Sequence, residues 1–353
     1  MHTLNELDAQ EETRVRKHRP VMRDVANRAG VALSTVSRVL SGHPDVGPDM
    51  RVRVMSAAAD LGYEPDILAQ SLRTGETMTV GFVVGDISNP LISQIARGAE
   101  ASLRQSGRAM LLTNSFNDPS LDRQHIKLLN QRRVDGLILS ISDDSDPETA
   151  QVVAELSIPC VLVDRQLVGI DTAAVLSDHS QGITQAFDYL VSSGHRRMGL
   201  VNGYLNVRPA RERSRALLDL VGMNQEVSVD VRNSSFTATH GFDSTIDMLS
   251  SDDPPTAIIA GSNQILVGIL RALKKLTLRV GVDVALVTSD DIPLLEFLDP
   301  PMPTISRDPE EMGRQAAGLL LEMLAGGPRR TLELPTRLRF AGSDDNRNYG
   351  WME

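Results

Sequence analysis

Short β-rich runs alternate with helical segments over most of the chain, and this alternation restricts the fold more than any other feature. The runs begin at Thr79 and are TVGFVV, AMLLT, GLILS, CVLVD, MGLVN, AIIA and VALV. Segments with apolar residues at helical spacing, such as 91–105, separate them. Alternating strands and helices predict a parallel sheet with helices on both faces. About seven such units are too many for one ordinary sheet, so we expect two doubly wound subdomains.

Charge is divided unevenly along the chain. The whole sequence carries a net charge of -10, with 36 Lys and Arg against 46 Asp and Glu. By segment, the net charge is -4 for residues 1–12, +4 for 13–75 and -10 for 76–353. A basic module therefore precedes an acidic body. The overall acidity argues against a nucleic acid partner, but the basic module has to be judged separately.

The sequence argues against several classes of protein. No run approaches the roughly 18 uninterrupted apolar residues that a membrane span requires, and the polar first twenty residues carry no secretory signal. We therefore expect a cytoplasmic protein with no membrane partner. The single cysteine, Cys160, excludes an internal disulfide or a cysteine-rich zinc site, and its place in IPCVLV predicts a buried core residue.

The histidines give no sign of an enzyme. No nucleophile or metal-ligand spacing lies near them, and His195 falls in a predicted turn. Five others are scattered in loops or helices: His18, His43, His125, His179 and His240. We therefore expect no catalytic residue, no metal and no cofactor.

The basic module carries apolar residues at a spacing that predicts three short helices. Gly30 separates the first two, and Pro48 opens the third. In the third helix the apolar residues at this spacing are Val52, Met55 and Ala59. The residues expected to pack together are Val25, Ala26, Ala29, Val31, Val36, Val39 and Leu40. The first two helices, in DVANRAGVALSTVSRVL, are typical of a helix-turn-helix.

The outer face of the second helix carries the candidate DNA contacts. An α-helix fits the major groove, and residues near its amino end meet base edges, so Leu33 and Ser34 are expected to point at bases. Arg38 can donate two hydrogen bonds to a guanine, whereas Thr35 and Ser37 are expected to contact phosphates. The alternative for Arg38 is a solvated surface charge.

These motifs resemble those of the lac repressor family (LacI/GalR) of bacterial transcription regulators. The resemblance runs from about residue 21 to 340 and is carried by MRDVANRAGVALSTVSRVLSG, LGYEPDILAQSLRTG, VGFVVGDISNP, RRVDGLILS, IPCVLVDR, SSGHRRMGLVNG, ARERSRALL, LVTSDDIP and EEMGRQAAGLLLEML. It implies a flexible tail (1–20), a helix-turn-helix headpiece (21–64), a hinge helix and linker (65–78), an effector-binding and dimerisation core (79–340) and a C-terminal tail (341–353). Ala32 departs from the pattern, because the family usually has a serine there that caps the recognition helix.

The hinge segment has its own predicted mechanism. Asp66 can cap a helix over 66–73, but so short a helix is not stable alone in water. In the family this helix orders when two subunits bind an operator, which implies that Ala69 and Leu72 contact DNA and that Leu72 wedges into the minor groove. The alternative is that Leu68 and Leu72 pack on the third helix or on the body.

The resemblance also implies a core similar to periplasmic sugar-binding proteins, with an effector cleft between its two doubly wound subdomains. The implied cleft residues are Asp86, Ser88, Asn89, Asp164, Arg165, Arg211, Arg213, Phe236, Ser262 and Asp290. Asp290 would accept hydrogen bonds from a sugar's hydroxyls, Arg213 would donate to them, and Phe236 would stack on the ring. The alternatives are a surface ion pair between Arg213 and Asp290 and a core position for Phe236.

Departures from the family pattern bear on the ligand. Leu91 and Ile92 stand where Phe is frequent, Ser262 and Asn263 where Asn-Asp is common, and Ser289 where an aromatic residue precedes the paired aspartates. These exchanges favour a ligand that is smaller, more anionic or absent. The nearby arginines make a phosphorylated or carboxylated metabolite the alternative to a sugar, and they are Arg165, Arg208, Arg211 and Arg213.

The sequence therefore predicts a homodimeric repressor whose partners are a pseudo-palindromic double-stranded DNA operator and a small-molecule effector, a sugar or sugar derivative. The tail beyond 340 lacks a leucine heptad, which favours a dimer. Within this class, an activator and a regulator controlled by a partner protein remain alternatives. From another class, a stand-alone solute-binding protein is the alternative, and the helix-turn-helix argues against it.

Overall fold

The computed structural model describes residues 20–64, 75–290, 295 and 302–340. The chain divides into two compact units, the first ending at Thr77 and the second beginning at Met78. We call the described helical part of the first unit the headpiece and the second unit the core. None of the helices in the described ranges is long and apolar enough to cross a membrane.

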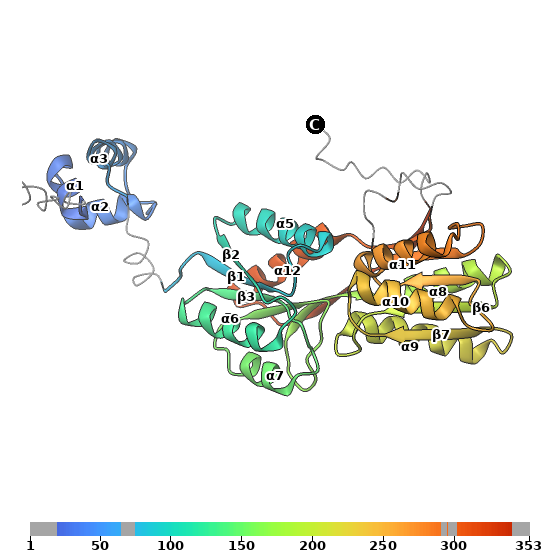
Figure 1. Cartoon of the computed structure of the whole chain (residues 1–353). Coiled ribbons are helices and arrows are strands. Elements are labelled where there is room, and N and C mark those ends of the chain that lie inside the picture. The colour runs from blue at the N-terminus through green and yellow to red at the C-terminus, as the bar shows by residue number, and fades with distance from the viewer. Residues whose placement is uncertain (1–19, 65–74, 291–294, 296–301, 341–353) are drawn as a thin grey trace, which may run out of the picture. The chain divides into compact units, whose positions relative to one another are not determined.

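The headpiece consists of three helices around a small apolar centre (Figure 1). They are α1 (Met22–Ala29), α2 (Leu33–Leu40) and α3 (Pro48–Leu61), as predicted. Gly30 ends α1 with a φ of 61°, which glycine adopts at little cost, and the Val31 amide donates to the Ala26 carbonyl at 3.0 Å. This turn sets the angle between α1 and α2, so that Val25, Val36 and Val54 are fully buried together.

The apolar residues whose spacing predicted α3 are not the ones that the helix buries. Val52 and Met55 are 69% and 51% exposed, and Ala59 is also exposed. The buried residues of α3 are Val54, Ala57 and Ala58. The exposed set and the buried set both recur at helical spacing, so the 3.6-residue period alone does not predict which of the two faces is buried. The packing of α3 against α1 and α2 makes the choice.

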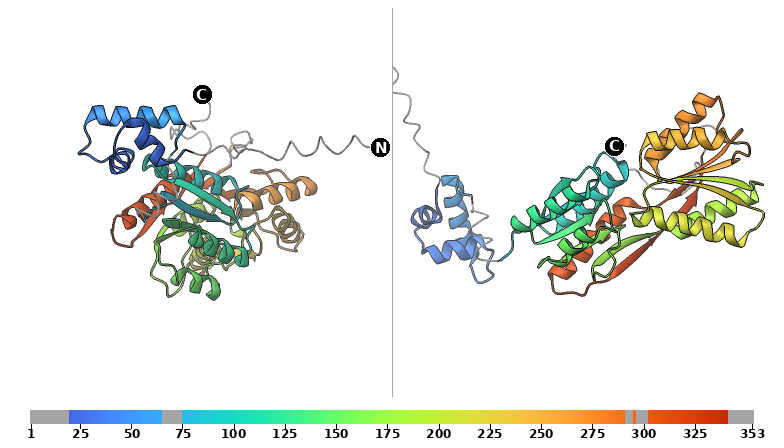
Figure 2. Two further views of the ribbon diagram at one scale, coloured as in Figure 1. Left: turned by 90° about the vertical axis from the view of Figure 1, so that its left-hand side faces the viewer. Right: turned by 60° about the horizontal axis from the view of Figure 1, so that its bottom comes forward.

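The first subdomain of the core is a six-stranded sheet in which all strands run parallel. In spatial order the strands are β11 (Thr331–Pro335), β5 (Ala173–Asp178), β4 (Cys160–Val163), β3 (Gly136–Ser140), β1 (Thr79–Val84) and β2 (Ala109–Asn114). One face is covered by α5 (Pro90–Gln105) and α12 (Pro309–Leu324), and the other by α6 (Pro119–Gln131) and α7 (Pro147–Ala154) (Figure 2). The central strands are buried on both sides, which explains their continuous apolar runs, and Cys160 is buried as predicted.

The second subdomain repeats this plan with one difference. Its strands in spatial order are β12 (Arg337–Arg339), β10 (Thr304–Ser306), β9 (Ala285–Ser289), β8 (Ala257–Ala260), β6 (Arg197–Asn202) and β7 (Ser228–Asn233). Strand β12 runs antiparallel to β10, and the other neighbouring pairs are parallel. One face is covered by α8 (His179–Ser192) and α9 (Arg208–Met223), and the other by α10 (Ala238–Leu249) and α11 (Asn263–Leu276). The predicted pair of doubly wound subdomains is confirmed.

Two glycines allow α5 and α12 to cross in close contact. A Cβ atom on Gly98 of α5 would lie 2.0 Å from the carbonyl oxygen of Glu310, and one on Gly313 of α12 would lie 2.0 Å from that of Ile95. Only glycine lets the two backbones approach so closely. The contact holds α12, which comes late in the chain, on the sheet of the first subdomain.

The chain crosses between the two subdomains three times, from β5 to α8, from β10 to α12 and from β11 to β12. Side chains of the crossing segments, such as His179, Arg307 and Thr336, therefore meet although they are far apart in the sequence. Several buried charged side chains lie at this junction, among them Asp164, Arg213 and Arg307.

Candidate functional site

The structure places the predicted DNA-contacting residues of the headpiece on one outer face of α2. Leu33 is 47% exposed, and Ser34 and Arg38 are also exposed. Thr35 and Ser37 are half-buried beside them. The Arg38 guanidinium lies 3.4 Å from the Asp45 carboxylate, and both side chains are exposed, so the pair contributes little and can be exchanged for a base.

The amino end of α2 lacks the usual cap. Ala32 occupies the N-cap position in an extended conformation, with no side-chain hydrogen bond to the first turn. We expect Ala32→Ser to stabilise the headpiece by about 1 kcal/mol, because the hydroxyl would accept from a free backbone amide. Calorimetry of the full chain should show the headpiece transition at a higher temperature. Ala59→Ser, at an exposed mid-helix position, is the control and should lower stability slightly. Equal shifts for both variants would contradict the capping argument.

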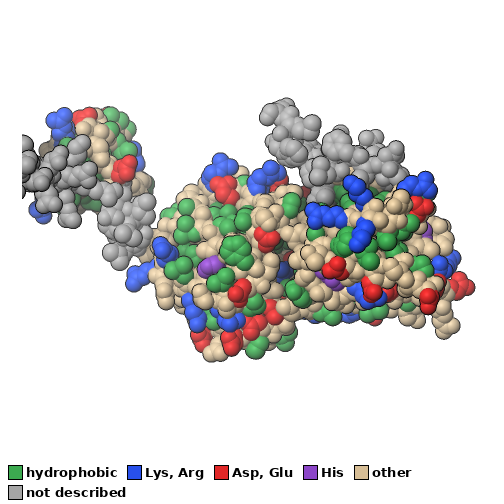
Figure 3. Space-filling model, in the orientation of Figure 1, with side chains coloured by type: hydrophobic (Ala, Val, Ile, Leu, Met, Phe, Trp, Pro, Cys, Tyr) green, Lys and Arg blue, Asp and Glu red, His purple; other side chains and the backbone are tan. Residues whose placement is uncertain are grey.

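Exposed charge is balanced in the headpiece. Four arginines are exposed, Arg23, Arg28, Arg38 and Arg53, and so are four carboxylates, Asp45, Asp49, Asp60 and Glu64. On the core, carboxylates gather around α7, where Glu148 and Glu155 are exposed (Figure 3). Phosphates would be repelled by this part of the core. The predicted hinge contacts Ala69 and Leu72 lie outside the described residues.

Asp164 is the centre of a buried charge cluster at the junction of the subdomains. It follows β4 and accepts hydrogen bonds from the Ser177 amide at 3.1 Å and from His179 Nε2 at 3.1 and 3.2 Å. Arg208 Nη1 lies 3.5 Å from Asp164 Oδ1, and Arg307 donates to Oδ2. Burial opposes the negative charge, but His179, Arg307 and Arg208 hold the pKa of Asp164 well below its usual range.

Arg307 joins the two subdomains through one guanidinium. Its Nε and Nη2 atoms each lie 2.9 Å from Asp290 Oδ1, while Nη1 donates to Asp164 and to Ser177 Oγ. Asp164 and Ser177 belong to the first subdomain, and Asp290 follows β9 of the second. Arg307 is buried and lies on the crossing from β10 to α12. It was not predicted from the sequence, because β10, the strand directly before it, has only three residues and forms no recognisable apolar run.

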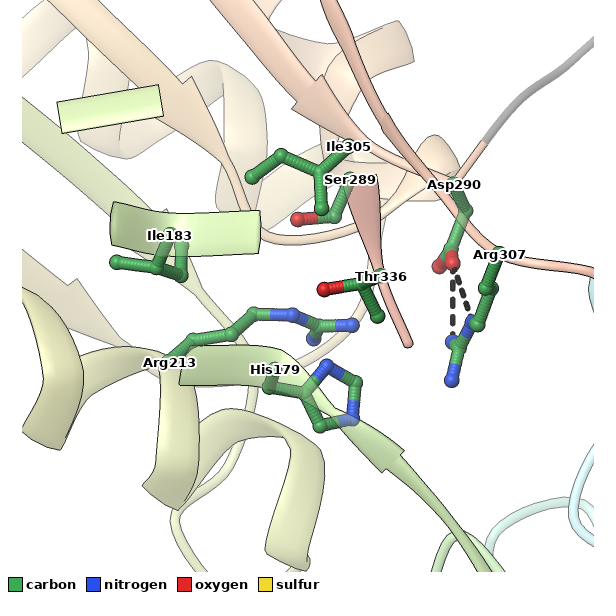
Figure 4. Close-up of a pocket in the computed structure, with 8 residues that line it drawn as sticks. All are labelled: His179, Ile183, Arg213, Ser289, Asp290, Ile305, Arg307 and Thr336. Atoms are coloured by element: carbon green, nitrogen blue, oxygen red, sulfur yellow. Dashed lines mark hydrogen bonds and ion pairs between the residues drawn. The ribbon is translucent and has the colours of Figure 1, made fainter. Parts of the chain in front are cut away.

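A small cavity lies beside this cluster (Figure 4). It is lined by His179, Ile183, Arg213, Ser289, Asp290, Ile305, Arg307 and Thr336. In this conformation it has room for about one water molecule. Arg213 and Asp290, which the sequence analysis named, thus share one cavity, and His179, Arg307 and Thr336 were missed as parts of it.

Arg213 and His179 give the cavity unusual electrostatics. Arg213 is 3% exposed, and its guanidinium makes no hydrogen bond or ion pair with the described residues. Its burial, against the attraction of Asp290, lowers the pKa of Arg213 to about 10, so the group stays charged. Burial likewise lowers the pKa of His179 to about 4, and its ring is neutral at pH 7.

The alternative of a surface ion pair between Arg213 and Asp290 is excluded by the structure. Both side chains are buried, and Asp290 pairs with Arg307. The predicted stacking residue, Phe236, does not line the cavity either. Its ring lies against the backbone of Gly203 and packs on the apolar cluster of the second subdomain.

Other predicted cleft residues connect the subdomains directly. Asn89 Oδ1 accepts from Asn263 Nδ2 at 3.0 Å, and Asp86 Oδ2 accepts from Gln264 Nε2 at 3.4 Å. Arg211 Nη1 lies 2.6 Å from the buried Asp144, a carboxylate that the sequence analysis missed. The cleft is therefore closed by side chains that bind each other.

Three predicted residues have local partners. Ser262 caps α11, with its hydroxyl accepting from the Ile265 amide at 3.2 Å. Arg165 donates to the backbone carbonyls of Ile141 and Asp164. Ser88 donates to Asp86. None of the three lines the cavity.

Two family profiles match the two units. "Bacterial regulatory proteins, lacI family" matches residues 21–66, and "Periplasmic binding protein-like domain" matches residues 187–343. The ribose operon repressor of Escherichia coli (strain K12) is 32% identical over 306 residues, which is 86% of this chain and 92% of that protein. The HTH-type transcriptional repressor PurR of Haemophilus influenzae (strain PittGG) is 29% identical over 309 residues, 86% of this chain and 90% of that protein.

Solved structures agree with these matches. The crystal structure of the lac repressor dimer bound to operator and the anti-inducer ONPF is 26% identical, covers 92% of this chain and 99% of that chain, and has a TM-score of 0.82. Relatives and structure alike extend over both the headpiece and the core. This chain therefore belongs to the lacI family of bacterial regulatory proteins and is a DNA-binding transcriptional regulator under the control of a small-molecule effector.

Proposed function

We propose that the protein is a repressor that binds a pseudo-palindromic operator as a homodimer in the cytoplasm, and that it works as a regulator and not as an enzyme. The observation that carries the proposal is the exposed face of α2, held by a buried apolar centre in the headpiece. The relatives named above are repressors, and one solved relative is a dimer on its operator. A dimer would present two copies of α2 to two half-sites in successive major grooves.

We assign DNA reading to residues 21–64, hinge formation to 65–78, and effector binding and pairing to 79–340, with tails at 1–20 and 341–353. Within the headpiece, Leu33 and Ser34 would meet base edges and Arg38 a guanine. Thr35 and Ser37 would contact phosphates. Ala69 and Leu72 would contact the minor groove at the centre of the operator.

For the effector we propose the cleft at the subdomain junction, with Asp164, Arg213 and Asp290 as its main contacts. The relative's name, ribose operon repressor, supports a sugar or sugar derivative. Asp86 and Asn89 would contribute from the first subdomain. Arg165, Phe236 and Ser262 do not line the cavity in the closed arrangement, and their contact with an effector would require the cleft to open.

Effector binding would change operator affinity by changing the arrangement of the two subdomains of the core. The closed cleft depends on contacts between them, such as Asn89 with Asn263 and Arg307 with Asp164 and Asp290. A ligand that replaces these contacts changes the stability of the closed arrangement and must, by linkage, change operator affinity.

Selection of DNA from a random pool by the full-length protein tests the function. We expect an enriched motif with two inverted half-sites, bound by a dimer in gel-shift and sedimentation measurements. The salt dependence should be steep, as phosphate contacts require. No enriched motif, or equal affinity for one half-site and two, would overturn the proposal.

A further inference from the structure

The cavity wall carries more positive than negative charge. Its ionised side chains at pH 7 are Arg213, Arg307 and Asp290, because His179 is neutral. Three other residues, Ile183, Ile305 and Thr336, add no charge. The wall therefore holds two guanidinium groups and one carboxylate.

One oxygen of the Asp290 carboxylate already pairs with Arg307. Arg307 places Nε and Nη2 at 2.9 Å from Asp290 Oδ1, and a third guanidinium nitrogen donates to Asp164. A carboxylate neutralised in this way is a poorer acceptor for the hydroxyls of a neutral sugar. One of the two oxygens of Asp290 is thus occupied within the protein, which leaves Oδ2 to accept from a ligand.

The second guanidinium has no such partner. Arg213 is nine-tenths buried or more, yet no hydrogen bond or ion pair joins its guanidinium to the described residues. Figure 4 shows its guanidinium reaching between His179 and Thr336, on the opposite side from the Asp290–Arg307 pair. The buried Ser289 hydroxyl on the same wall also lacks a partner in the described ranges. A buried cation without an acceptor is costly, so this wall is built to receive one from a ligand.

We propose that the effector carries an anionic group, a phosphomonoester or a carboxylate, which binds Arg213 and competes with Asp290 for Arg307. The inference rests on the proposed function, because it assigns the chemistry of the same cleft. Planar guanidinium groups bind such anions with paired, charge-assisted hydrogen bonds. Ser289 can donate a further bond to the same anion.

Competition for Arg307 gives the anion its effect on conformation. Arg307 connects Asp164 of the first subdomain to Asp290 of the second, so an anion that takes its N–H groups weakens a contact between subdomains. The cavity has room for about one water molecule, so the ligand enters as the cleft opens. Anion binding and the loss of the closed cleft are therefore coupled.

Titration calorimetry of the full-length protein tests the inference with three probes of similar size: D-ribose, D-ribose 5-phosphate and D-ribonate. We expect at least one of the two anions to bind about 10- to 100-fold more tightly than ribose. The phosphate and the carboxylate distinguish the two sources of charge. Arg213→Gln should reduce that anion's affinity to about that of ribose, and Arg213→Lys should restore part of it, because lysine keeps the charge but not the planar fork.

A matched control is Arg329→Gln, which removes an exposed guanidinium that pairs with Asp171 away from the cavity. It should leave all three affinities unchanged. Ribose binding as tightly as both anions, absence of binding by both anions, or an anion preference that survives Arg213→Gln would each overturn the inference. Operator selection separates this result from the proposed function: specific DNA binding together with a preference for neutral ribose defeats the anion inference alone.

Discussion

Asp164→Ala is expected to lower the free energy of unfolding of the core by about 3–5 kcal/mol. The carboxylate is buried and is shared by Arg307, Arg208 and His179, so its loss leaves two buried guanidinium groups without their common partner. Urea unfolding of the full chain followed by circular dichroism measures the change. Asp171→Ala is the matched control, since that carboxylate is 86% exposed and pairs with Arg329 at 3.4 Å. It should cost no more than about 1 kcal/mol.

Acid unfolding gives a second readout of the same variant. The folded-state pKa of Asp164 is lowered, so its contribution is fully present above the unfolded pKa of about 3.9 and is lost as pH falls through the folded pKa. The difference between the wild type and Asp164→Ala should therefore be constant from pH 5 to 7 and shrink at lower pH. Similar stability losses for Asp164→Ala and Asp171→Ala would show that the cluster does not hold the subdomains together.

Arg38→Ala is expected to weaken operator binding by about 5- to 150-fold, the loss of one bidentate contact to a base. Preference at one operator position should relax at the same time, because the side chain distinguishes guanine from other bases. Gel-shift titrations against a set of single-base operator variants at fixed salt measure both effects. A uniform loss across all of these operators would instead make Arg38 a phosphate contact.

Arg53→Ala is the control for this experiment. Arg53 is an exposed arginine of α3, outside the outer face of α2. Its replacement should change affinity by a similar factor for every operator, or not at all. Unchanged affinity and base preference in Arg38→Ala would remove the recognition role of α2.

Strands and helices with strong local patterns were predicted well. The buried central strands are continuous apolar runs. In the headpiece, Gly30 lies at the turn that ends α1, and Pro48 is the first residue of α3, as predicted. Strands β5, β7, β10, β11 and β12 were not singled out. Three of these, β7, β11 and β12, lie at sheet edges, where polar residues such as Arg232 and Glu333 interrupt the apolar pattern. Strand β10 has only three residues.

Individual residues of the site were predicted from the sequence, but the contacts that join them were not. Asp164, Arg213 and Asp290 were named because they follow strands or begin a helix, and they meet at the subdomain junction. The residues that join them were not named. Arg307 contacts Asp164 across 143 positions of sequence, and a separation of that size leaves no local pattern.

The sequence by itself determined the alternation of strands and helices in the core, the helix-turn-helix, and the division into a basic N-terminal module and an acidic body. Periodicity, turn residues and charge are local properties, which a linear reading preserves. Tertiary structure alone decided which face of α3 is buried and that Phe236 packs on Gly203. It also decided that Arg307 pairs with Asp290, which leaves Arg213 without a hydrogen-bond acceptor among the described residues. In the core, these contacts depend on which side chains the three crossings between the subdomains bring close together. The residues concerned are far apart in the sequence, so only the folded core determines which of them are within contact distance.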